Sequence, residues 1–345
     1  MPVTLQQKLL AFIRGGSGNF TELALEVFAF QYAHNPFYRA FCDHQQAAVT
    51  RWEDIPAVPT SAFKEFSIAC FPVSEALAEF HTSGTTSEKA GKHYFKTREL
   101  YDAASRPNFI AHLSPDAADL PVLALTPSPV EAPHSSLAHM LGIVAGNDCE
   151  FFVERDVLLL ERLTQRLCEI QWDNQPVMLL GTAFAFVHLF DHLATTHFEL
   201  PEGSRAMETG GFKGRSRAVS KPELYKSFTS QLGIPPQRIV NEYGMTELST
   251  QFYDETMRID RQSDRKTVSP WARVLIIDPA TGQVAPAGER GLIRVLDLAN
   301  LWSAICIQTE DLGIAHADGT FEVLGRVDGA EVRGCSLNAE ALRKA

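Results

Sequence analysis

The spacing of apolar residues changes along the chain and predicts two kinds of architecture. Near the N-terminus, apolar residues three and four apart predict helices over residues 4–13 and 19–44. From about residue 97 to 240, short apolar runs alternate with helical patterns. This alternation predicts an α/β architecture with parallel strands.

The elements of the alternating region follow from run length and from capping residues. The expected strands are 121–125, 177–180 and 238–240. The expected helices are 97–106, 156–170, 183–193 and 221–232. Thr97 begins the first of these helices, and Gly233 followed by two prolines ends the last.

The pattern becomes β-rich near residue 271. Strands are expected over 272–277, 291–298 and 320–324, and Asp278–Gly282 has the composition of a turn between strands. We therefore expect an α/β body up to about residue 270 with layered parallel sheets and helices. A small antiparallel β subdomain is expected over about 271–325.

Composition narrows the function classes. In the 345 residues no apolar run approaches the ~18–20 residues of a membrane span, so we expect no membrane partner. The N-terminal apolar run, Leu9–Ile13, is too short for a signal peptide, which predicts a cytoplasmic protein. A net charge of −11 argues against nucleic-acid binding. The six cysteines form no C-x-x-C pair, which predicts reduced thiols.

Residues 81–94, HTSGTTSEKAGKHY, form the most informative stretch. Small residues let a backbone approach an anion, hydroxyl and N–H groups bind phosphate oxygens, and a lysine adds charge. The stretch predicts a loop for nucleotide phosphates, with a polar surface loop as the alternative. It is not a Walker A loop, because six residues separate Gly84 from Gly91 and His93 occupies the Ser/Thr position.

A second motif is IVNEYGMTE, residues 239–247, where a predicted strand leads into a glycine turn. Glu247 offers a hard carboxylate ligand for Mg²⁺, and Tyr243 can stack on a purine. The alternative is a strand followed by a helix that Thr246 caps.

Two further motifs carry glycines and charges. Gly210 and Gly211 in ETGGFK allow close approach to a flat ligand such as adenine, although a plain turn explains them equally. In QTEDLG, Asp311 in a strand-to-turn position can accept both ribose hydroxyls, and Arg326 in LGRVD can add a contact. The alternative is a turn aspartate with an exposed salt bridge.

The order of these motifs resembles that of the acyl-adenylate-forming superfamily. The opening stretches, YAHNPFYRAF at 32–41 and residues 52–64, and the ending EVRGCSL at 331–337 resemble the acyl-protein synthetase (LuxE-type) family. Phenylacetate–CoA ligases have a similar opening. The resemblance covers almost the whole chain and implies an adenylation core over 1–325. It also implies a hinge and a truncated tail over 326–345, so that the C-terminal small domain is absent or reduced.

The resemblance implies a role for each motif residue, with ATP and Mg²⁺ as cofactors. The implied nucleotide-binding residues are Thr82, Ser83, Gly84, Thr85, Thr86, Gly210, Gly211, Tyr243, Gly244, Asp311 and Arg326. The implied catalytic residues are Lys92, Thr246, Glu247 (also the Mg²⁺ ligand) and Cys335. The implied substrate-binding residues are His134, Ser135, Ser136 and Met245. The helix with Phe184, Phe186 and His188 is expected to pack in the core, with lining of the acyl pocket as the alternative.

The implied function is ATP-dependent activation of a fatty or aromatic carboxylic acid, followed by transfer of the acyl group to a thiol. The thiol would be Cys335, flanked by Gly334 and Arg333, and then that of a partner protein. One alternative is direct transfer to CoA or to a carrier-protein phosphopantetheine. A second is a non-catalytic nucleotide-binding subunit. The chain departs from the family pattern in two ways. Ser87 stands where the family has glycine, and the catalytic lysine that the C-terminal small domain supplies in the superfamily is missing.

Overall fold

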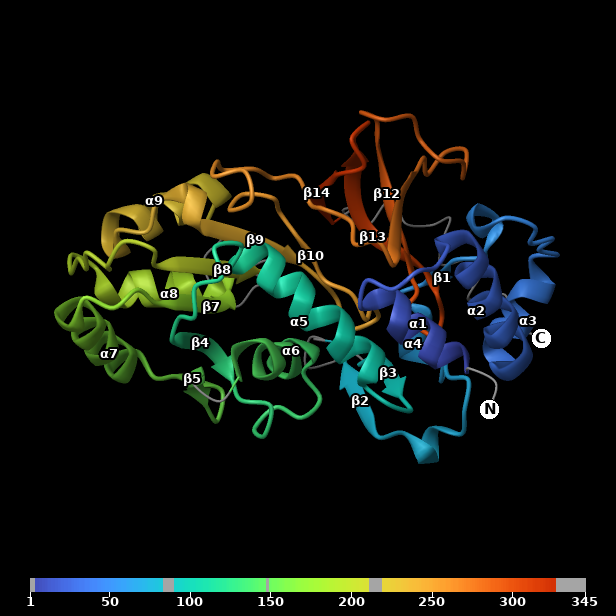
Figure 1. The fold of residues 1–345 in the computed structure, drawn as a ribbon, viewed down its shortest axis with the longest axis horizontal. Coiled ribbons are helices and arrows are strands. Elements are labelled where there is room, and N and C mark those ends of the chain that lie inside the picture. The colour runs from blue at the N-terminus through green and yellow to red at the C-terminus, as the bar shows by residue number, and fades with distance from the viewer. Residues whose placement is uncertain (1–3, 83–89, 147–148, 211–218, 327–345) are drawn as a thin grey trace. The chain divides into compact units, whose positions relative to one another are not determined.

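The computed structural model describes residues 4–82, 90–146, 149–210 and 219–326, shown as a ribbon in Figure 1. The chain forms two compact units. Unit 1 holds the described residues of Met1–Ser105, Met245–Thr250 and Lys266–Ala345. Unit 2 holds those of Arg106–Gly244 and Gln251–Arg265.

Unit 2 is built on a seven-stranded sheet of order β10-β9-β8-β7-β4-β5-β6. The strands from β9 to β5 in this order are parallel, and β10 and β6 add antiparallel edges. The strand bounds are β4 (Val122–Pro127), β5 (Cys149–Glu154), β6 (Val157–Leu158), β7 (Met178–Thr182), β8 (Arg205–Thr209), β9 (Ile239–Tyr243) and β10 (Phe252–Tyr253). The parallel sheet that the alternation of strands and helices predicts is therefore confirmed.

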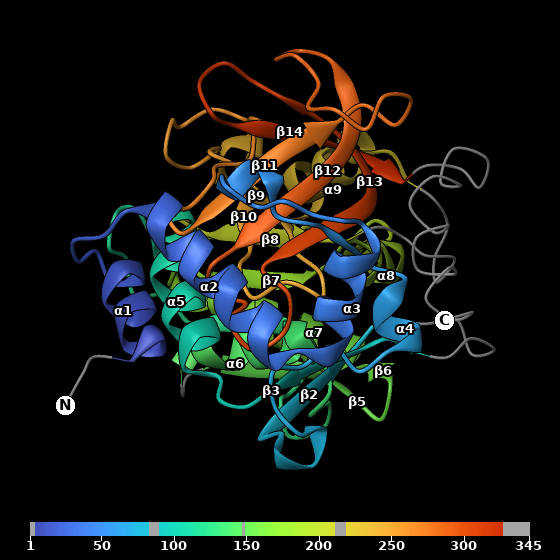
Figure 2. The same cartoon turned by 90° about the vertical axis from the view of Figure 1, so that its right-hand side faces the viewer.

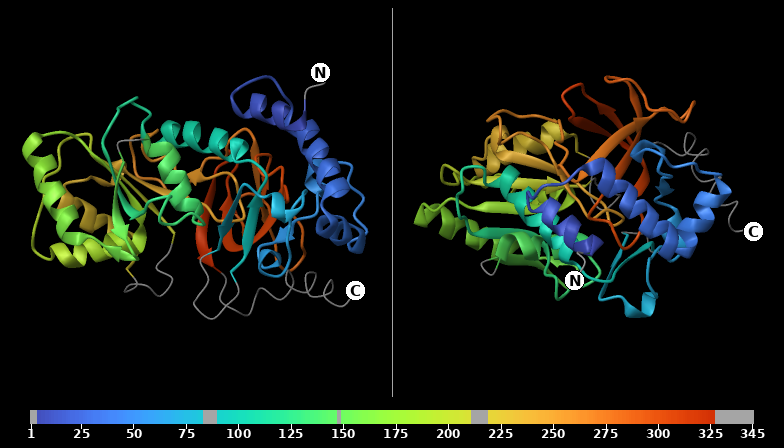
Figure 3. Two further views of the ribbon diagram at one scale, coloured as in Figure 1. Left: turned by 90° about the horizontal axis from the view of Figure 1, so that it is seen from below. Right: turned by 45° about the vertical axis from the view of Figure 1, so that its right-hand side comes forward.

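Helices pack on this sheet and bury its apolar side chains (Figure 3). They are α6 (Ser136–Ala145), α7 (Leu160–Asp173), α8 (Ala183–Leu193) and α9 (Lys221–Leu232), with a 3-10 turn at Pro236–Arg238. Phe186 of α8 is fully buried, and its ring centroid lies 4.6 Å from that of Phe228 of α9. The expectation that this helix packs in the core is confirmed for Phe186 and for the half-buried Phe184, but it is wrong for His188, which is exposed.

Unit 1 contains a second, mostly antiparallel sheet of order β1-β13-β12-β11, with β14 paired to β13 (Figure 2). Its strands are β1 (Val58–Pro59), β11 (Ala272–Ile277), β12 (Arg290–Asp297), β13 (Cys306–Ala315) and β14 (Phe321–Arg326). A separate hairpin pairs β2 (Ala78–His81) with β3 (Lys92–Phe95). The antiparallel β-rich region expected after residue 271 is confirmed as part of this sheet.

The first four helices of unit 1 precede the β2–β3 hairpin in the sequence, with α4 following β1. They are α1 (Leu5–Ile13), α2 (Phe20–His34), α3 (Pro36–His44) and α4 (Ala62–Glu65), with 3-10 turns at Trp52–Asp54 and Val73–Glu75. Helix α5 (Glu99–Leu113) continues in sequence from unit 1 into unit 2. Among the residues described, no helix has the length and apolar character needed to cross a membrane.

Two predicted helices differ from the structure, and some observed elements were not predicted. The single helix expected over 19–44 is two helices, because Asn35 is extended and its side chain accepts the Tyr38 N–H at 3.1 Å as the cap of α3. Helix α5 continues past Arg106 to Leu113 with Pro107 inside it. Helix α6 had no counterpart among the predicted elements.

Candidate functional site

The predicted phosphate loop connects β2 to β3 in unit 1. Its ends are joined, because Thr82 N donates to Gly91 O at 2.9 Å and Gly91 N donates to Thr82 Oγ1 at 2.8 Å. One residue beyond each end, His81 pairs with Lys92 in the hairpin register. These hydrogen bonds therefore fix the two ends of the loop relative to each other. The predicted residues Ser83, Gly84, Thr85 and Thr86 lie outside the described part of the chain.

Thr246 and Glu247 lie in a turn that is bound to this hairpin. Thr246 Oγ1 donates to His81 O of β2 at 3.2 Å, and His93 Nδ1 of β3 lies 2.8 Å from Thr246 O. The alternative in which Thr246 caps a helix is wrong, because no helix begins here and its hydroxyl bonds to β2 instead. The residues predicted for phosphate and for Mg²⁺ thus share one part of unit 1.

Charged and titratable groups surround the ends of the loop. Lys92 Nζ lies 3.1 Å from Glu79 Oε1, and His81 Nε2 lies 2.8 Å from the same oxygen. Burial tends to raise the pKa of Glu79, but the hydrogen bonds and charges of His81 and Lys92 outweigh it and lower the pKa. Lys92 is thereby oriented by a carboxylate on the neighbouring strand. Burial lowers the pKa of His93 to about 4, so its ring is neutral at pH 7.

Asp311 and Arg326 are brought together on the paired strands β13 and β14. They are register partners, and Arg326 Nε lies 3.6 Å from Asp311 Oδ1. The expected strand-to-turn position of Asp311 is wrong. Asp311 lies inside the ten-residue β13, next to a register shift between Leu312 and Gly313. That irregularity re-aims side chains locally, which is how a mid-strand carboxylate can serve a site.

A continuous set of contacts within unit 1 links β13 to the hairpin. Gln308, three residues and about 10 Å along the strand from Asp311, accepts the Thr60 N–H through its carbonyl at 3.1 Å. Phe63 N donates to Thr60 O, and the Phe63 ring packs edge-on against His93 at 5.8 Å. Thr82, Glu247 and Asp311 therefore all lie in unit 1, and their convergence around one nucleotide stays a prediction.

The predicted adenine residues lie in unit 2, at the carboxyl ends of the adjacent parallel strands β8 and β9. Gly210 follows β8 with φ +72°, a left-handed conformation that favours glycine. Tyr243 ends β9, and Gly244 follows it. Gly211 lies outside the described residues. A side chain at Gly244 would have to displace the buried carboxylate of Glu242, which also binds the Thr209 hydroxyl.

The predicted substrate residues of unit 2 precede or begin α6. Ser135 Oγ accepts the Ala138 N–H at 3.1 Å, so this side chain caps the helix. His134 is exposed, and Ser136 begins the helix. Met245 belongs to unit 1, where its carbonyl accepts the Leu248 N–H at 3.1 Å. Substrate contact by these four residues stays a prediction.

Three buried polar residues near Thr246 and Glu247 were not identified from the sequence as functional: His93, Asp297 and Asn300. Asn300 Nδ2 donates to Glu247 O at 3.0 Å, and Asp297 Oδ2 accepts the Ser249 N–H at 2.9 Å. Burial raises the pKa of Asp297 to about 6. The available signal was an aspartate and an asparagine inside the apolar run VLDLANL.

The described cysteines are mostly buried. Burial raises the pKa values of Cys42, Cys70, Cys149 and Cys306 to about 12. Cys168 on α7 is exposed. Cys335 lies outside the described residues.

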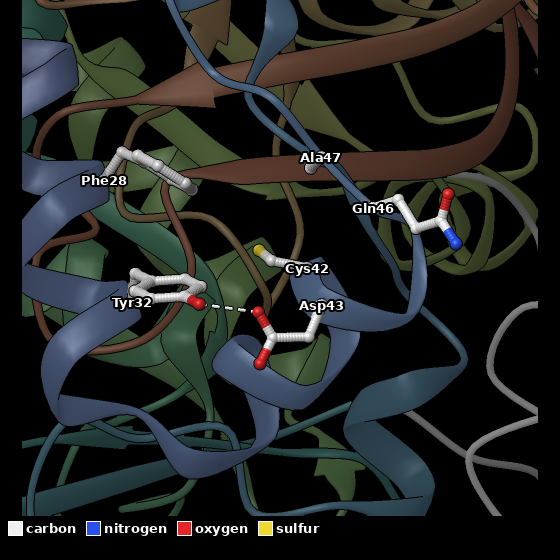
Figure 4. Close-up of a pocket in the computed structure, with 6 residues that line it drawn as sticks. All are labelled: Phe28, Tyr32, Cys42, Asp43, Gln46 and Ala47. Atoms are coloured by element: carbon white, nitrogen blue, oxygen red, sulfur yellow. Dashed lines mark hydrogen bonds between the residues drawn. The ribbon is translucent and has the colours of Figure 1, made fainter.

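A cavity of about 280 Å³ lies between α2 and α3, beside the Cys42 thiol (Figure 4). Tyr32 Oη donates to Asp43 Oδ1 at 2.6 Å along its wall. The remaining lining residues are Phe28, Gln46 and Ala47. The described residues that line it include no lysine, arginine, glycine, serine or threonine, so the cavity does not have the residues of a phosphate site.

Comparison with known proteins points to one family. The family model for acyl-protein synthetases, LuxE, matches residues 17–342. A long-chain-fatty-acid–luciferin-component ligase from Vibrio harveyi is 23% identical over 339 residues, which cover 92% of this chain and 86% of that protein. The match to the family model and this similarity both run through the stretches that carry the predicted motifs.

Solved structures share the fold. A 2-hydroxyisobutyryl-CoA ligase in complex with 2-HIB-AMP and CoA has a TM-score of 0.65 at 17% identity, covering 95% of this chain and 70% of that protein. ATP-bound MatB from Rhodopseudomonas palustris has a TM-score of 0.53 at 16% identity, covering 76% of this chain. The matched region spans 50% of the length of MatB. These similarities confirm the predicted α/β fold class.

Proposed function

The chain belongs to the acyl-protein synthetase (LuxE) family of ATP-dependent, AMP-forming acid–thiol ligases, and we propose that it activates a fatty or aromatic carboxylic acid as its adenylate and passes the acyl group to Cys335. The observation that carries the proposal is the binding of the turn with Thr246 and Glu247 to both strands that flank the loop. This arrangement puts a carboxylate and a hydroxyl beside a phosphate-binding sequence.

In the first step, a carboxylate oxygen of the acid attacks the α-phosphorus of ATP. The bond from that phosphorus to the bridging oxygen breaks, so acyl-AMP forms and pyrophosphate leaves. We assign the triphosphate to Thr82–Thr86 and Lys92, and the α-phosphate or the substrate carboxylate to Thr246. Glu247, 7% exposed, suits Mg²⁺, which takes one or two carboxylates together with phosphate oxygens. Bound there, Mg²⁺ would neutralise charge on the phosphates.

The rest of the nucleotide is assigned to two groups of residues. Asp311 is proposed to accept both ribose hydroxyls, with Arg326 as a further contact, and their pairing on β13 and β14 supports this assignment. The adenine contacts are proposed for Gly210, Gly211 and Tyr243. The left-handed Gly210 and the close packing of Glu242 against Gly244 support close backbone approach at the ends of β8 and β9.

In the second step, a thiolate attacks the carbonyl carbon of acyl-AMP, a thioester forms and AMP leaves. Cys335 is the proposed first acceptor, and a partner protein the next. Thiols with pKa values near 12 are almost wholly protonated at neutral pH and are poor nucleophiles, which disfavours the buried cysteines. A phosphopantetheine thiol of CoA or of a carrier protein is the alternative acceptor.

Adenylate formation is tested by ATP–pyrophosphate exchange over a panel of fatty and aromatic acids. We expect exchange that depends on Mg²⁺ and on at least one class of acid. A folded protein that binds ATP and shows no exchange with any acid would support the non-catalytic alternative and overturn the proposal.

The acceptor is tested with Cys335→Ser, and Cys168→Ser is the matched control because Cys168 is the exposed cysteine among the described residues. With a radiolabelled acid and ATP, we expect Cys335→Ser to abolish labelled protein while exchange persists, and Cys168→Ser to keep both. Persistent thioester formation on added CoA or carrier protein with Cys335→Ser would favour direct transfer to an external thiol.

A further inference from the structure

Two consecutive backbone carbonyls of the turn that carries Glu247 are each bound by a buried side chain. His93 Nδ1 lies 2.8 Å from Thr246 O, and Asn300 Nδ2 lies 3.0 Å from Glu247 O. Both side chains are almost fully buried, at 1% and 2% exposure. Since the turn belongs to no helix or strand, side chains replace the regular hydrogen bonds that would otherwise fix its backbone.

The direction of the histidine contact follows from its chemistry. A carbonyl oxygen only accepts, so Nδ1 of His93 must carry the proton. The ring is held in place by Phe95, at a centroid distance of 4.2 Å, and by Phe63 edge-on at 5.8 Å. A buried, packed ring has few alternative rotamers, so the N–H points at Thr246 O in a defined direction.

The asparagine is equally constrained. Its Nδ2 donates to Glu247 O and to Ala304 O, at 3.0 and 2.8 Å, which uses both of its N–H groups. Its Oδ1 accepts from Ser249 Oγ at 3.2 Å. The fully buried Asp297 accepts the Ser249 N–H and the Thr250 hydroxyl, at 2.9 and 2.8 Å. The chain from Glu247 onward is thus anchored at Glu247, Ser249 and Thr250.

We propose that His93 and Asn300 are positioning residues that aim the Glu247 carboxylate at the metal of bound MgATP. The inference rests on the proposed function, and it assigns these residues no contact with the nucleotide. His93 follows Gly91 by two residues on β3, and Thr246 Oγ1 bonds to β2, so the hairpin that carries the loop also sets the turn. A shift of β2 or β3 would therefore shift the turn that carries Glu247.

The test compares His93→Phe with His93→Asn. Phenylalanine fills the same space and lacks the donor, whereas the side-chain amide of asparagine places an N–H near the position of Nδ1. The measurement is the factor by which Mg²⁺ strengthens ATP binding, taken from ATP dissociation constants in Mg²⁺ and in EDTA. We expect this factor to fall 10- to 100-fold in His93→Phe, the range seen when groups that orient a metal ligand are lost. Recovery to within a few-fold is expected in His93→Asn.

His112→Phe is the matched control. His112 is also a buried histidine whose Nδ1 lies 2.7 Å from a backbone carbonyl, that of Asn108, but it belongs to α5 in unit 2. We expect a comparable loss of stability toward urea in this variant and no change in the Mg²⁺ factor. In EDTA, His93→Phe should weaken ATP binding less than it does in Mg²⁺, since Thr246, which is proposed to contact the α-phosphate or the substrate, lies in the same turn as Glu247.

The outcomes separate the positioning role of His93 and Asn300, called the clamp below, from the proposed function. If the wild-type protein binds ATP no more tightly with Mg²⁺, and Glu247→Gln changes nothing, the metal assignment fails and the clamp fails with it. If the wild type shows the Mg²⁺ effect and folded His93→Phe retains it, only the clamp is overturned. An equal loss in His112→Phe also overturns it. If His93→Phe does not fold, Asn300→Ser, which shortens the donor to Glu247 O, decides by the same measurement.

Discussion

Individual residues of the site were predictable where they form a motif and not where they act through distant partners. Thr246 and Glu247 follow a strand and a glycine, which marks them in the sequence. His93 bonds to a carbonyl 153 residues away, and Asn300 to one 53 residues away. No spacing rule relates such positions, because the fold alone brings them together. Their residue types in apolar surroundings were the only local sign.

His93 also predicts how stability depends on pH. Its pKa falls from an ordinary value of 6.5 to about 4 in the folded state because burial disfavours the charged ring. Below pH 6.5 the unfolded chain gains a proton that the folded chain does not, so stability is lost as the pH falls toward 4. We expect wild type to lose roughly 2 kcal/mol more than His93→Asn between pH 7.5 and 5. Urea unfolding of both proteins at the two pH values measures this difference, and equal losses would contradict it.

At the scale of elements, boundaries were predictable where caps are local. Helix α9 follows Ser220, which caps it, and ends at Gly233 in a left-handed conformation, and its predicted and observed ranges agree. The break at Asn35 was missed because apolar residues continue on both sides of it. Asp311 was expected at a strand end because its neighbours, Thr309 and Gly313, are typical of turns. The ladder with β12 and β14 overrides that local tendency.

Asp116 and Arg205 anchor the chain after α5 to the start of β8. Arg205, 1% exposed, donates to Asp116 at 2.8 and 2.9 Å and to Leu113 O at 2.9 Å. We expect Asp116→Asn to lower the free energy of unfolding by about 1–3 kcal/mol, since a buried guanidinium loses its charged partner. Urea unfolding at pH 7 measures the change. The nearby exposed Asp119→Asn is the control and should have no comparable effect.

The same pair has a defined pH window. The hydrogen bonds from Arg205 hold the pKa of Asp116 at about 2, below its usual 3.8. The stabilisation is therefore present above the usual pKa and is lost as the pH falls from about 4 toward 2. The difference between wild type and Asp116→Asn should shrink over that interval. A difference that stays constant would show that the ion pair is not its source.

Gly313 fixes how β14 pairs with β13. A Cβ at this position would lie 2.6 Å from Glu322 O and 2.7 Å from the Ile293 side chain, so Gly313→Ala must push β14 away. We expect a loss of about 1–3 kcal/mol from overpacking. We also expect faster amide exchange over Phe321–Arg326, which includes the partner of Asp311. In the control Gly282→Ala, with φ +72° and open space around it, β14 exchange should not change. Unchanged exchange in Gly313→Ala would contradict the packing argument.

At the scale of the whole molecule, the fold class was predictable because each level of the sequence agrees. The alternation of strands and helices and the later β-rich pattern predict the same α/β architecture that the motif resemblance implies, and the family model matches residues 17–342. The division into units was not predictable in the same way. The segment Met245–Thr250 belongs to unit 1, although in the sequence it lies between the two segments of unit 2. Only long-range contacts, such as those of Asp297 and Asn300, place that segment.

Binding of MgATP should stabilise the folded chain as a whole. A ligand that binds only the folded state adds about 2.7 kcal/mol at 100 times its dissociation constant. If Asp311 accepts the ribose hydroxyls, Asp311→Asn should remove about 1.4 kcal/mol of binding energy, which corresponds to about tenfold weaker binding of MgATP. The gain from MgATP would then fall to about 1.4 kcal/mol at the same ligand concentration. Urea unfolding with and without MgATP measures both gains.

The control for this prediction comes from the same β-hairpin. Asp318 lies in the turn between β13 and β14, where its carboxylate accepts the Thr320 N–H and hydroxyl at 3.0 and 2.6 Å. Asp318→Asn alters charge to the same extent as Asp311→Asn but leaves the paired strand position of Asp311 and Arg326 in place. It should therefore keep the full gain from MgATP. Equal losses in the two variants would mean that charge on the hairpin, and not a ribose contact at Asp311, governs nucleotide binding.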